Sequence, residues 1–236
     1  MRNNKTKFCI VLLFVFGFTG LQAQTVKDIN GNVYKTVTIG KQVWMAANLK
    51  TTKYNNGTPI PNIKVDSTWE ALKTGAYSDY DNNPKNSTTY GRLYNWYTVS
   101  DARKLCPTGW HVPTDAEWTT LENYLIANGY NWDGTTTGNK IAKSMASTSG
   151  WTTSGPSGTL GSDQASNNRS RFTAFPSGSR FDDGTYGNVE LDGNWWSSTE
   201  NAKASAYNRE MHSLDSFVSR KNYYKANGFS VRCLHD

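Results

Sequence analysis

The clearest pattern of apolar and polar positions lies in the stretch CPTGWHVPTDAEWTTLENYL, residues 106–125. Apolar residues recur there at the i, i+3 and i+7 spacing of one helix face, at Trp118, Leu121 and Leu125. Thr114 and Glu117 have the form of a capping box, in which each side chain satisfies a backbone N–H of the first turn. The pattern predicts a helix that begins at Asp115 and ends at Asn128-Gly129, with an apolar face that must pack on another element.

Two other segments show a weaker helical spacing. Residues 93–99 carry apolar side chains at i, i+3 and i+4, at Leu93, Trp96 and Tyr97. Residues 138–147 carry Ile141, Ala142 and Met145. We expect the first segment to be a helix packed against the one that begins at Asp115, because the connection is short and both apolar faces need cover.

The rest of the pattern is typical of strands and loops. Residues 33–39 and 42–45 alternate in part and flank Gly40-Lys41, which predicts a hairpin. The final third predicts short strands, ending in GFSVRCL, where Phe229, Val231 and Cys233 face one way and Arg232 the other. Residues 50–64 predict a surface loop, and the Ser-, Thr- and Gly-rich segment 147–170 predicts a long irregular one.

The N-terminus has the pattern of a secretory signal peptide. A basic segment, MRNNKTK, precedes the apolar run FCIVLLFVFGFTG and the small-residue exit LQAQ. The run is too short to span a membrane, although an N-terminal anchor that is retained is the alternative. We therefore expect residues 1–24 to be removed, residues 25–236 to form a single domain, and the mature protein to be secreted or held at the cell surface.

The net charge argues against nucleic-acid binding. The chain has 25 basic and 19 acidic residues, but Arg2, Lys5 and Lys7 belong to the signal peptide. Without them the formal charge falls from +6 to 22 − 19 = +3. Because no basic run or stripe appears in the mature part, nucleic acid is set aside as a partner.

The aromatic content favours a loop-rich extracellular domain. The 236 residues include 9 Trp, 13 Tyr and 9 Phe, separated mostly by Gly, Asn, Ser and Thr. Such a composition suits short strands with one or two helices rather than a helical bundle.

Two cysteines, Cys106 and Cys233, remain in the mature chain. In an oxidising compartment, an even pair so far apart in sequence predicts a disulfide bond with each other. A reactive or metal-binding thiol pair is the alternative, but no CxxC motif or histidine cluster accompanies either cysteine.

The sequence offers one weak candidate for a calcium loop. Asp79, Asp81 and Asn83 alternate as the first ligands of such a loop do. However, Pro84 stands where the loop needs glycine, and Tyr90 where it needs a bidentate acid. A solvated acidic turn is therefore the preferred interpretation, and neither a metal nor any other cofactor is predicted.

Six ordered motifs resemble the Fibrobacter succinogenes major paralogous domain family: NGNVYKTVTIGKQVWMAANL, YGRLYNWYTV, LCPTGWHVPTDAEW, RFTAFPSGSR, NWWSSTE and GFSVRCL. The resemblance covers nearly the whole mature chain. Proteins of that family are secreted or surface-borne in bacteria, and their molecular role is largely undefined. The resemblance therefore implies a location but no reaction.

A more distant resemblance concerns the fold. VPTDAEWTTL is similar to a segment of formylglycine-generating-enzyme-like proteins, which have a C-type-lectin-like fold. This likeness implies an α+β fold with two main helices flanking small twisted antiparallel sheets, paired terminal strands, and an irregular loop region on one side. Fold alone does not imply function.

Three classes of function remain after these observations. A formylglycine-generating-enzyme-like oxidase would use active-site cysteines, whereas Cys106 and Cys233 are placed for a structural bond. Catalysis is not expected, because no nucleophile motif stands beside any of the three histidines, His111, His212 and His235. A structural extracellular component without a ligand site is a further alternative.

We expect a binding or adhesion module for an extracellular glycan or protein. Aromatic faces and planar polar groups permit such binding, although the calcium-dependent lectin signatures are absent. The candidate ligand-binding residues gather in the final third of the chain, at Arg180, Trp195, Glu200 and Arg209. The sequence predicts no oligomeric state.

Overall fold

The computed structural model describes residues 24–236. The predicted signal peptide, residues 1–24, falls on residues 1–23 outside that part and on Gln24, so it stays a prediction. In the part of the chain that the structure describes, no helix combines the length and apolarity needed to cross a bilayer.

A small antiparallel sheet has the strand order β1-β2-β3-β13-β6. Its strands are β1 (Thr25–Lys27), β2 (Val33–Ile39), β3 (Gln42–Met45), β6 (Trp110–His111) and β13 (Leu234–His235). The predicted hairpin of β2 and β3 is confirmed, and Gly40 adopts a positive φ of 63° in its turn. Because β13 pairs with both β3 and β6, the C-terminal strand lies inside the sheet.

A larger sheet has the order β11-β10-β9-β7-β12-β5-β4, with β8 paired to β7. Its strands are β4 (Tyr77–Ser78), β5 (Leu93–Asn95), β7 (Ser177–Arg180), β8 (Tyr186–Val189), β9 (Asp192–Ala202), β10 (Ser205–His212), β11 (Ser219–Tyr224) and β12 (Gly228–Phe229). All its pairings are antiparallel except that of β7 with β9, where Gly178 lies opposite Gly193.

One long helix, α4 (Asp115–Ala127), begins as the sequence predicts. The Thr114 side chain accepts from the Glu117 N–H, and the Glu117 side chain accepts from the Thr114 N–H, which completes the capping box. The other helical elements have three to five residues each: α1 (Asp66–Glu70), η1 (Tyr80–Asn82), α2 (Asn86–Tyr90), α3 (Trp96–Val99), α5 (Ala142–Met145) and η2 (Gln164–Ser166). The α+β class is therefore confirmed, but the prediction of two main helices is wrong.

The error lies at residues 93–99, which divide into strand β5 and the single turn α3. Asn95 causes the change, because its side-chain oxygen accepts from the Thr98 N–H and caps a helix that starts only at Trp96. Before that cap the chain is extended, and Tyr94 lies between Tyr77 of β4 and Phe229 of β12. Sheet pairing thus replaces the first half of the expected helix.

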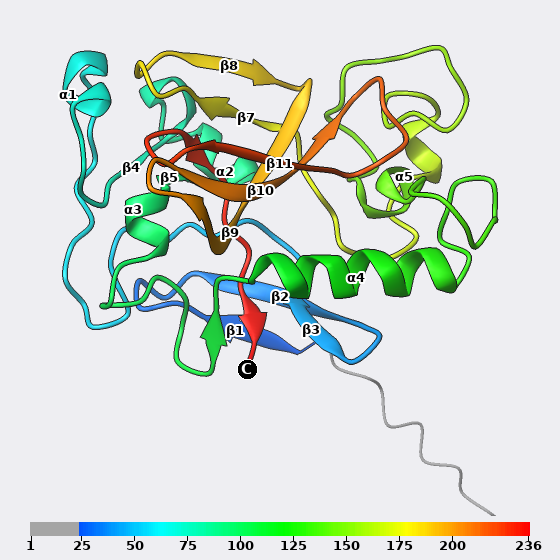
Figure 1. Cartoon of the computed structure of the whole chain (residues 1–236), viewed down its shortest axis with the longest axis horizontal. Coiled ribbons are helices and arrows are strands. Elements are labelled where there is room, and N and C mark those ends of the chain that lie inside the picture. Colours follow the sequence, from blue (N-terminus) through cyan, green and yellow to red (C-terminus); the bar gives the residue numbers. More distant parts are fainter. Residues whose placement is uncertain (1–23) are drawn as a thin grey trace, which may run out of the picture.

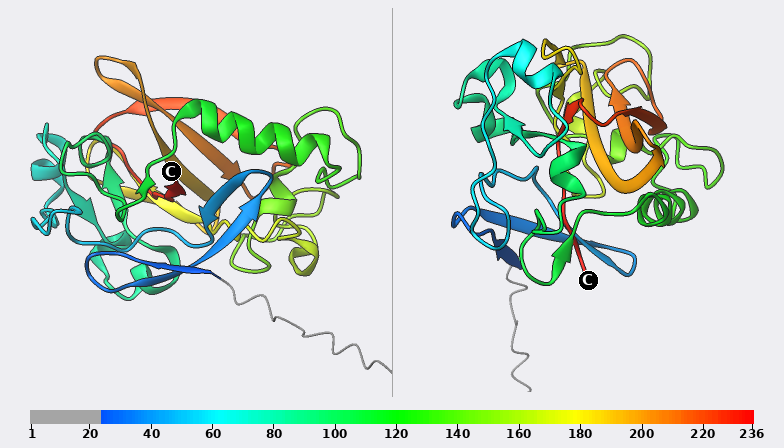
Figure 2. Two further views of the ribbon diagram at one scale, coloured as in Figure 1. Left: turned by 90° about the horizontal axis from the view of Figure 1, so that it is seen from below. Right: turned by 60° about the vertical axis from the view of Figure 1, so that its left-hand side comes forward.

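Helix α4 lies between the two sheets, with β2 and β3 below it and β10 and β11 above it in the view of Figure 1. Its apolar residues Trp118, Leu121 and Leu125 are buried in one of two core clusters, which also contains Trp44, Phe172 and Trp195. The long irregular loops gather beyond its C-terminal end, while α1 and α3 lie at the opposite end of the molecule (Figures 1 and 2). Trp151 is buried within the loop region.

The predicted disulfide is present between Cys106 and Cys233, whose Cα atoms are 5.9 Å apart. Both cysteines are buried in the second core cluster, together with Val112 and Val231. The bond joins the segment that leads into β6 to the residue that precedes β13. It therefore ties the end of the chain to the entrance of α4.

Candidate functional site

Arg180, the first of the four candidate residues, is buried at the end of β7. Its Nε donates to the Gly184 carbonyl at 2.8 Å, and its Nη2 to Asp66 Oδ1 at 3.0 Å. The guanidinium also stacks on Trp69 and Tyr186, with its carbon 4.3 Å and 4.8 Å from the ring centroids. Arg180 thus fastens α1 to the β7–β8 turn and presents no exposed surface.

Trp195 is also buried, and it belongs to a polar network inside the core. Its Nε1 donates to Asn48 Oδ1 at 2.9 Å, and Arg232 Nε donates to the same oxygen at 2.9 Å. Arg232 also donates from Nη2 to the Thr173 carbonyl at 2.5 Å and from Nη1 to the Phe172 carbonyl. The sequence analysis missed this network.

The sequence predicted one strand with Arg232 on the face opposite to Val231 and Cys233, but β12 ends at Phe229, and all three side chains are buried. The side chain is fully buried, and no carboxylate of the described residues pairs with it. Burial lowers the pKa of its guanidinium to about 9. The hydrogen bonds of this buried cation hold residues 172 and 173 next to Asn48.

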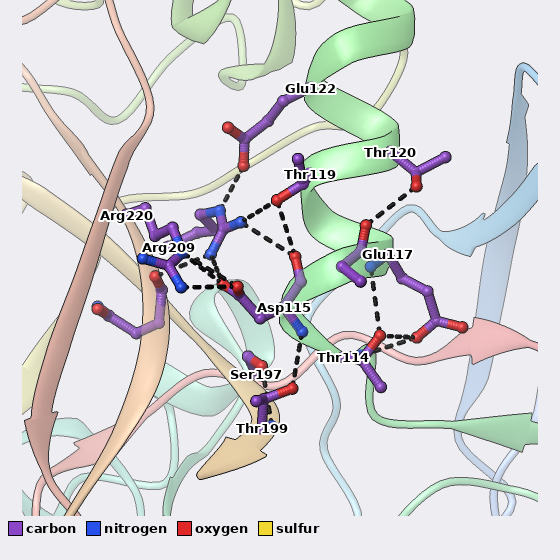
Figure 3. A network of polar contacts seen from close by, with 12 residues as sticks. Thr114, Asp115, Glu117, Thr119, Thr120, Glu122, Ser197, Thr199, Arg209 and Arg220 are labelled. Carbon is purple, nitrogen blue, oxygen red and sulfur yellow. Dashed lines mark hydrogen bonds and ion pairs between the residues drawn. The ribbon is translucent and has the colours of Figure 1, made fainter. Parts of the chain in front are cut away.

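Arg209 is buried between β10 and α4 and joins the strand to that helix (Figure 3). Its Nη1 donates to Asp115 Oδ1 at 2.7 Å, and its Nε donates to Glu122. Arg220 of β11 binds the same Asp115 carboxylate, with Nη2 2.9 Å from Oδ2. Burial raises the pKa of Glu122, and the charge of Arg209 only partly offsets that effect.

Asp115 and Glu117 at the start of α4 behave in the opposite way. Burial raises the pKa of each carboxyl, but hydrogen bonds outweigh it and leave both pKa values below their usual range. The donors are Arg220 and Arg209 for Asp115, and Thr114 for Glu117. Both carboxylates therefore stabilise the fold as anions.

Acidification is expected to remove this stabilisation. Because the folded pKa of Asp115 lies below its ordinary 3.8, its contribution is present above that pH and is lost as the pH falls through the lower folded value. Asp115→Asn is expected to cost about 2 kcal/mol at pH 7, since the buried Arg209 loses a charged partner. Thermal unfolding from pH 7 to pH 3 measures this loss, which should shrink below pH 4. Glu190→Gln, an exposed substitution, serves as the control and should change little; a pH-independent loss would contradict the account.

Glu200 is the one candidate residue on the surface. It forms an ion pair with Lys225 at 3.1 Å, and Lys225 Nζ also donates to the Lys203 carbonyl at 3.0 Å. The four candidates therefore do not converge on one exposed site. Ligand contact stays a prediction for them, and only Glu200 has the surface to make it directly.

Lys225 lines a polar cleft of about 310 Å³ between α1, α3 and the turns that follow β7, β9 and β11. Its walls are formed by Glu70, Lys73, Tyr97, Asp182, Ala204, Tyr224, Lys225 and Ala226. Tyr224 is 61 % exposed, and Tyr97 is half-buried. The cleft thus combines two phenol rings with both signs of charge.

A second cleft of about 440 Å³ lies between the β2–β3 turn and α4. It is more apolar and is lined by Ile39, Gly40, Lys41, Gln42, Thr120 and Tyr124. The Tyr124 ring packs against Gly40, where an added Cβ would lie 2.8 Å from the ring. The cleft therefore offers an apolar wall but few polar groups to orient a ligand.

Two of the three histidines are paired with acids rather than with nucleophiles, and His235 lies against the Asp236 backbone carbonyl. His111 Nδ1 lies 2.6 Å from Asp236 Oδ1, and its Nε2 lies 3.0 Å from Glu117 Oε1. His212 Nε2 lies 3.6 Å from Asp192, whose pKa is raised by burial. Between residues 24 and 236, no group of three or more His, Cys, Asp or Glu side chains is arranged to hold a metal ion.

The candidate calcium ligands are divided by the fold. Asp79 is buried, accepts from the Ser87 hydroxyl, and pairs with Arg92 at 3.2 Å. Asp81 is exposed, at a positive φ of 57°. The prediction of a solvated acidic turn is thus wrong for Asp79, which a neighbouring arginine neutralises.

Comparison with known proteins identifies a family but no characterised relative. No curated protein and no solved structure matches the chain. The model of the Fibrobacter succinogenes major domain matches residues 37–235, which is most of the chain and includes the larger sheet, α4, the disulfide and the smaller sheet apart from β1 and the first half of β2. The resemblance seen in the six motifs is therefore confirmed, and the chain belongs to the Fibrobacter succinogenes major domain family.

Proposed function

We propose that the chain is a secreted or cell-surface binding module, without catalytic activity, that binds an extracellular saccharide. The proposal is carried by the polar cleft beside Glu200, where the exposed ring of Tyr224 faces the same space as charged side chains of both signs. Its volume of about 310 Å³ lies at the lower end of the range typical of small-molecule sites.

The chemistry of the cleft suits a sugar. A phenol ring offers an apolar face to the C–H groups of a pyranose, while its hydroxyl remains available for hydrogen bonding. Glu70 and Asp182 can accept from sugar hydroxyls, and Lys73 can donate to them. A mixture of acids and lysines favours a neutral saccharide over a strongly charged one.

The disulfide supports a role without catalysis. An oxidase of the formylglycine-generating kind needs free active-site cysteines, whereas Cys106 and Cys233 are bonded to each other. A disulfide sulfur carries no thiolate to act as a nucleophile or metal ligand. Detection of free thiols in the native protein would favour the oxidase instead.

We also propose that the α+β architecture is C-type-lectin-like. The expected pairing of the terminal strands is wrong, because β2 and β3 lie between β1 and β13 in the smaller sheet. The proposal is supported by the presence of both terminal strands in that one sheet, and by the long loop region beyond α4. Superposition of an experimental structure on a C-type lectin domain would test it. A different strand order in the shared sheet would contradict it.

A structural extracellular component without a ligand is the second candidate. It is favoured by the tryptophans, because every one except Trp132 is buried. An indole inside the core stabilises the fold and meets no ligand. Under this alternative the mature protein would bind no glycan at all.

Substitution of Tyr224 by alanine is expected to weaken saccharide binding about tenfold, because it removes one ring face worth roughly 1–1.5 kcal/mol. A glycan array would first identify the ligand, and isothermal titration would then compare the variants. Tyr124→Ala, at an exposed tyrosine of the second cleft, is the matched control and should bind as the wild type does.

Two results would contradict the proposal. If the mature protein binds no glycan, the structural alternative is favoured. If Tyr224→Ala binds as tightly as Tyr124→Ala, the saccharide does not lie in the cleft beside Glu200.

A further inference from the structure

Trp132 is the one tryptophan outside the core, and 44 % of it is exposed. It belongs to the loop that follows α4. That loop lies at the end of the molecule opposite to α1 and α3 (Figure 1). An indole left in water forgoes the stabilisation that burial gives to the other tryptophans. The exposure of Trp132 therefore calls for an explanation other than stabilisation of the fold.

The indole lies with one face against Gly158. A Cβ added at Gly158 would stand 2.3 Å from Cε2 and 2.5 Å from both Cδ2 and Nε1 of Trp132. A point so nearly equidistant from three atoms around the ring fusion lies above the ring, not beside its edge. One face of Trp132 thus packs on the glycine backbone, while 44 % of the residue remains exposed.

The loop that carries Trp132 is fixed by Asn131, whose side chain is fully buried. Asn131 Nδ2 donates to the carbonyls of Thr137 and Gly138 at 3.0 Å and 3.1 Å, and its Oδ1 accepts from the Lys140 N–H at 2.9 Å. The Trp132 N–H donates to the Lys140 carbonyl at 3.1 Å. The backbone that carries the ring is therefore held in place before any ligand arrives, which reduces the entropy lost on binding.

Polar groups stand next to the ring in sequence and in the same loop. Asp133 Oδ2 lies 2.5 Å from Lys140 Nζ, and the Thr135 hydroxyl donates to Asp133 Oδ1 at 2.6 Å. The hydrogen bond from Lys140 lowers the pKa of Asp133 to about 2, so the carboxylate is ionised at ordinary pH. An ionised acceptor and a lysine donor thus belong to the same short loop as the partly exposed indole.

We propose that Trp132 is a second saccharide-binding platform, on which a neutral pyranose stacks its C–H face while Asp133 and Lys140 hydrogen-bond its hydroxyls. A single ring surface among polar groups suits a sugar, which has one apolar face and a polar edge, better than it suits a protein partner, which needs a wider apolar area. The platform is separate from the cleft beside Glu200 and does not depend on it.

The test uses the mature protein and three hexasaccharides, of β-1,4-linked glucose, xylose and mannose. Because the other tryptophans are buried, a sugar stacked on the ring is expected to change the tryptophan emission through Trp132. Trp132→Ala is expected to abolish that change and to weaken binding at least tenfold by calorimetry. Trp132→Phe, which keeps a ring, should retain part of the affinity.

Two further variants distinguish stacking on Trp132 from nonspecific hydrophobic binding and from loss of folding. Phe217→Ala removes another exposed ring, 42 % exposed, and should leave the affinity unchanged. Gly158→Ala keeps the indole, but the added methyl group displaces the ring from its packing contact with Gly158. It should weaken binding while the circular dichroism spectrum stays the same.

Absence of any emission change with all three sugars at millimolar concentration would overturn the proposal. Equal losses in Trp132→Ala and Phe217→Ala would also overturn it, because they would indicate a hydrophobic docking surface for protein. Loss of binding in Tyr224→Ala alone would place the saccharide in the cleft and likewise refute the platform. Loss in Trp132→Ala alone would support the platform and argue against the cleft.

Discussion

Replacement of both Cys106 and Cys233 by serine is expected to lower the free energy of unfolding by about 4–5 kcal/mol. The two residues are 127 positions apart, so the disulfide restricts a long loop in the unfolded chain. In the chain-entropy model the stabilisation grows slowly with loop length, and a loop of this size lies near the upper end of the usual range.

The bond also lies where the two sheets are joined. Residues 228–229 belong to β12 of the larger sheet, and residues 234–235 form β13 of the smaller one. Between them, the Val231 carbonyl accepts from the Leu49 N–H and the Cys233 carbonyl from the Met45 N–H. Without the disulfide, the last strand keeps these hydrogen bonds but loses its covalent link to the entrance of α4.

Urea unfolding of the mature protein would measure the effect, with the double serine variant and the wild type compared with and without reductant. In thermal unfolding, the midpoint of the variant is expected to lie roughly 10–20 °C lower, from the usual conversion of unfolding free energy into midpoint temperature for a domain of this size. Reductant should bring the wild type to the variant's value and leave the variant unchanged. A wild type with the same unfolding midpoint in reductant would show that the disulfide adds no stability.

The sequence was sufficient to predict those elements whose structure is determined by residues close together in the chain. The capping box of Thr114 and Glu117 uses groups three positions apart, and the β2–β3 hairpin depends on a turn at Gly40. The disulfide followed from compartment and cysteine count. The start of α4, the hairpin and the bond between Cys106 and Cys233 were therefore all predicted correctly.

The sequence was ambiguous where a short apolar run suits both a helix and a buried strand. Leu93, Trp96 and Tyr97 have helical spacing, yet all three residues of β5 are buried. Residues 93–95 form a strand because Asn95 caps α3 and because β4 and β12 pair with β5 on either side. The pairing with β12 joins residues more than 130 positions apart, which no local pattern reveals.

The burial of two candidate residues, Arg180 and Arg209, could not be predicted for a related reason. Arginines are usually exposed, and Arg180 and Arg209 were proposed as ligand-binding residues because aromatic and charged residues cluster in the final third. Their acidic partners are Asp66, Asp115 and Glu122, each on a distant segment of the chain. Burial of an arginine depends on such partners, and a single sequence does not show which acid will meet it. Trp132, by contrast, was not singled out, because its exposure distinguishes it only in the folded chain.

Replacement of Arg232 by methionine is expected to destabilise the fold by about 3 kcal/mol, although it removes a buried charge. Arg232 is the extreme case of the buried arginines, since its hydrogen-bond partners are two backbone carbonyls and the amide oxygen of Asn48. The pKa of its guanidinium is lowered to about 9 because burial disfavours the charged form. Two effects of the substitution therefore oppose each other.

The loss is expected to exceed the gain. Methionine leaves the carbonyls of Phe172 and Thr173 buried without a donor, at roughly 1–3 kcal/mol each, while Asn48 Oδ1 keeps its bond from Trp195. Relief of the buried charge returns a few kcal/mol, because desolvation of an ion is costly. The guanidinium also packs over Phe172, 4.2 Å from its ring centroid, and that stacking is lost as well.

Urea unfolding at pH 7 would measure the net effect, with Arg171→Met as a matched control. Arg171 is exposed and stands beside the same segment, so its substitution should change the free energy of unfolding by less than about 0.5 kcal/mol. Arg232→Lys keeps the charge but has fewer donors to reach the carbonyls, and it should lose part of the stability. If Arg232→Met proves as stable as the wild type, desolvation of the guanidinium cancels everything that its hydrogen bonds contribute, and the network around Asn48 does not stabilise the fold.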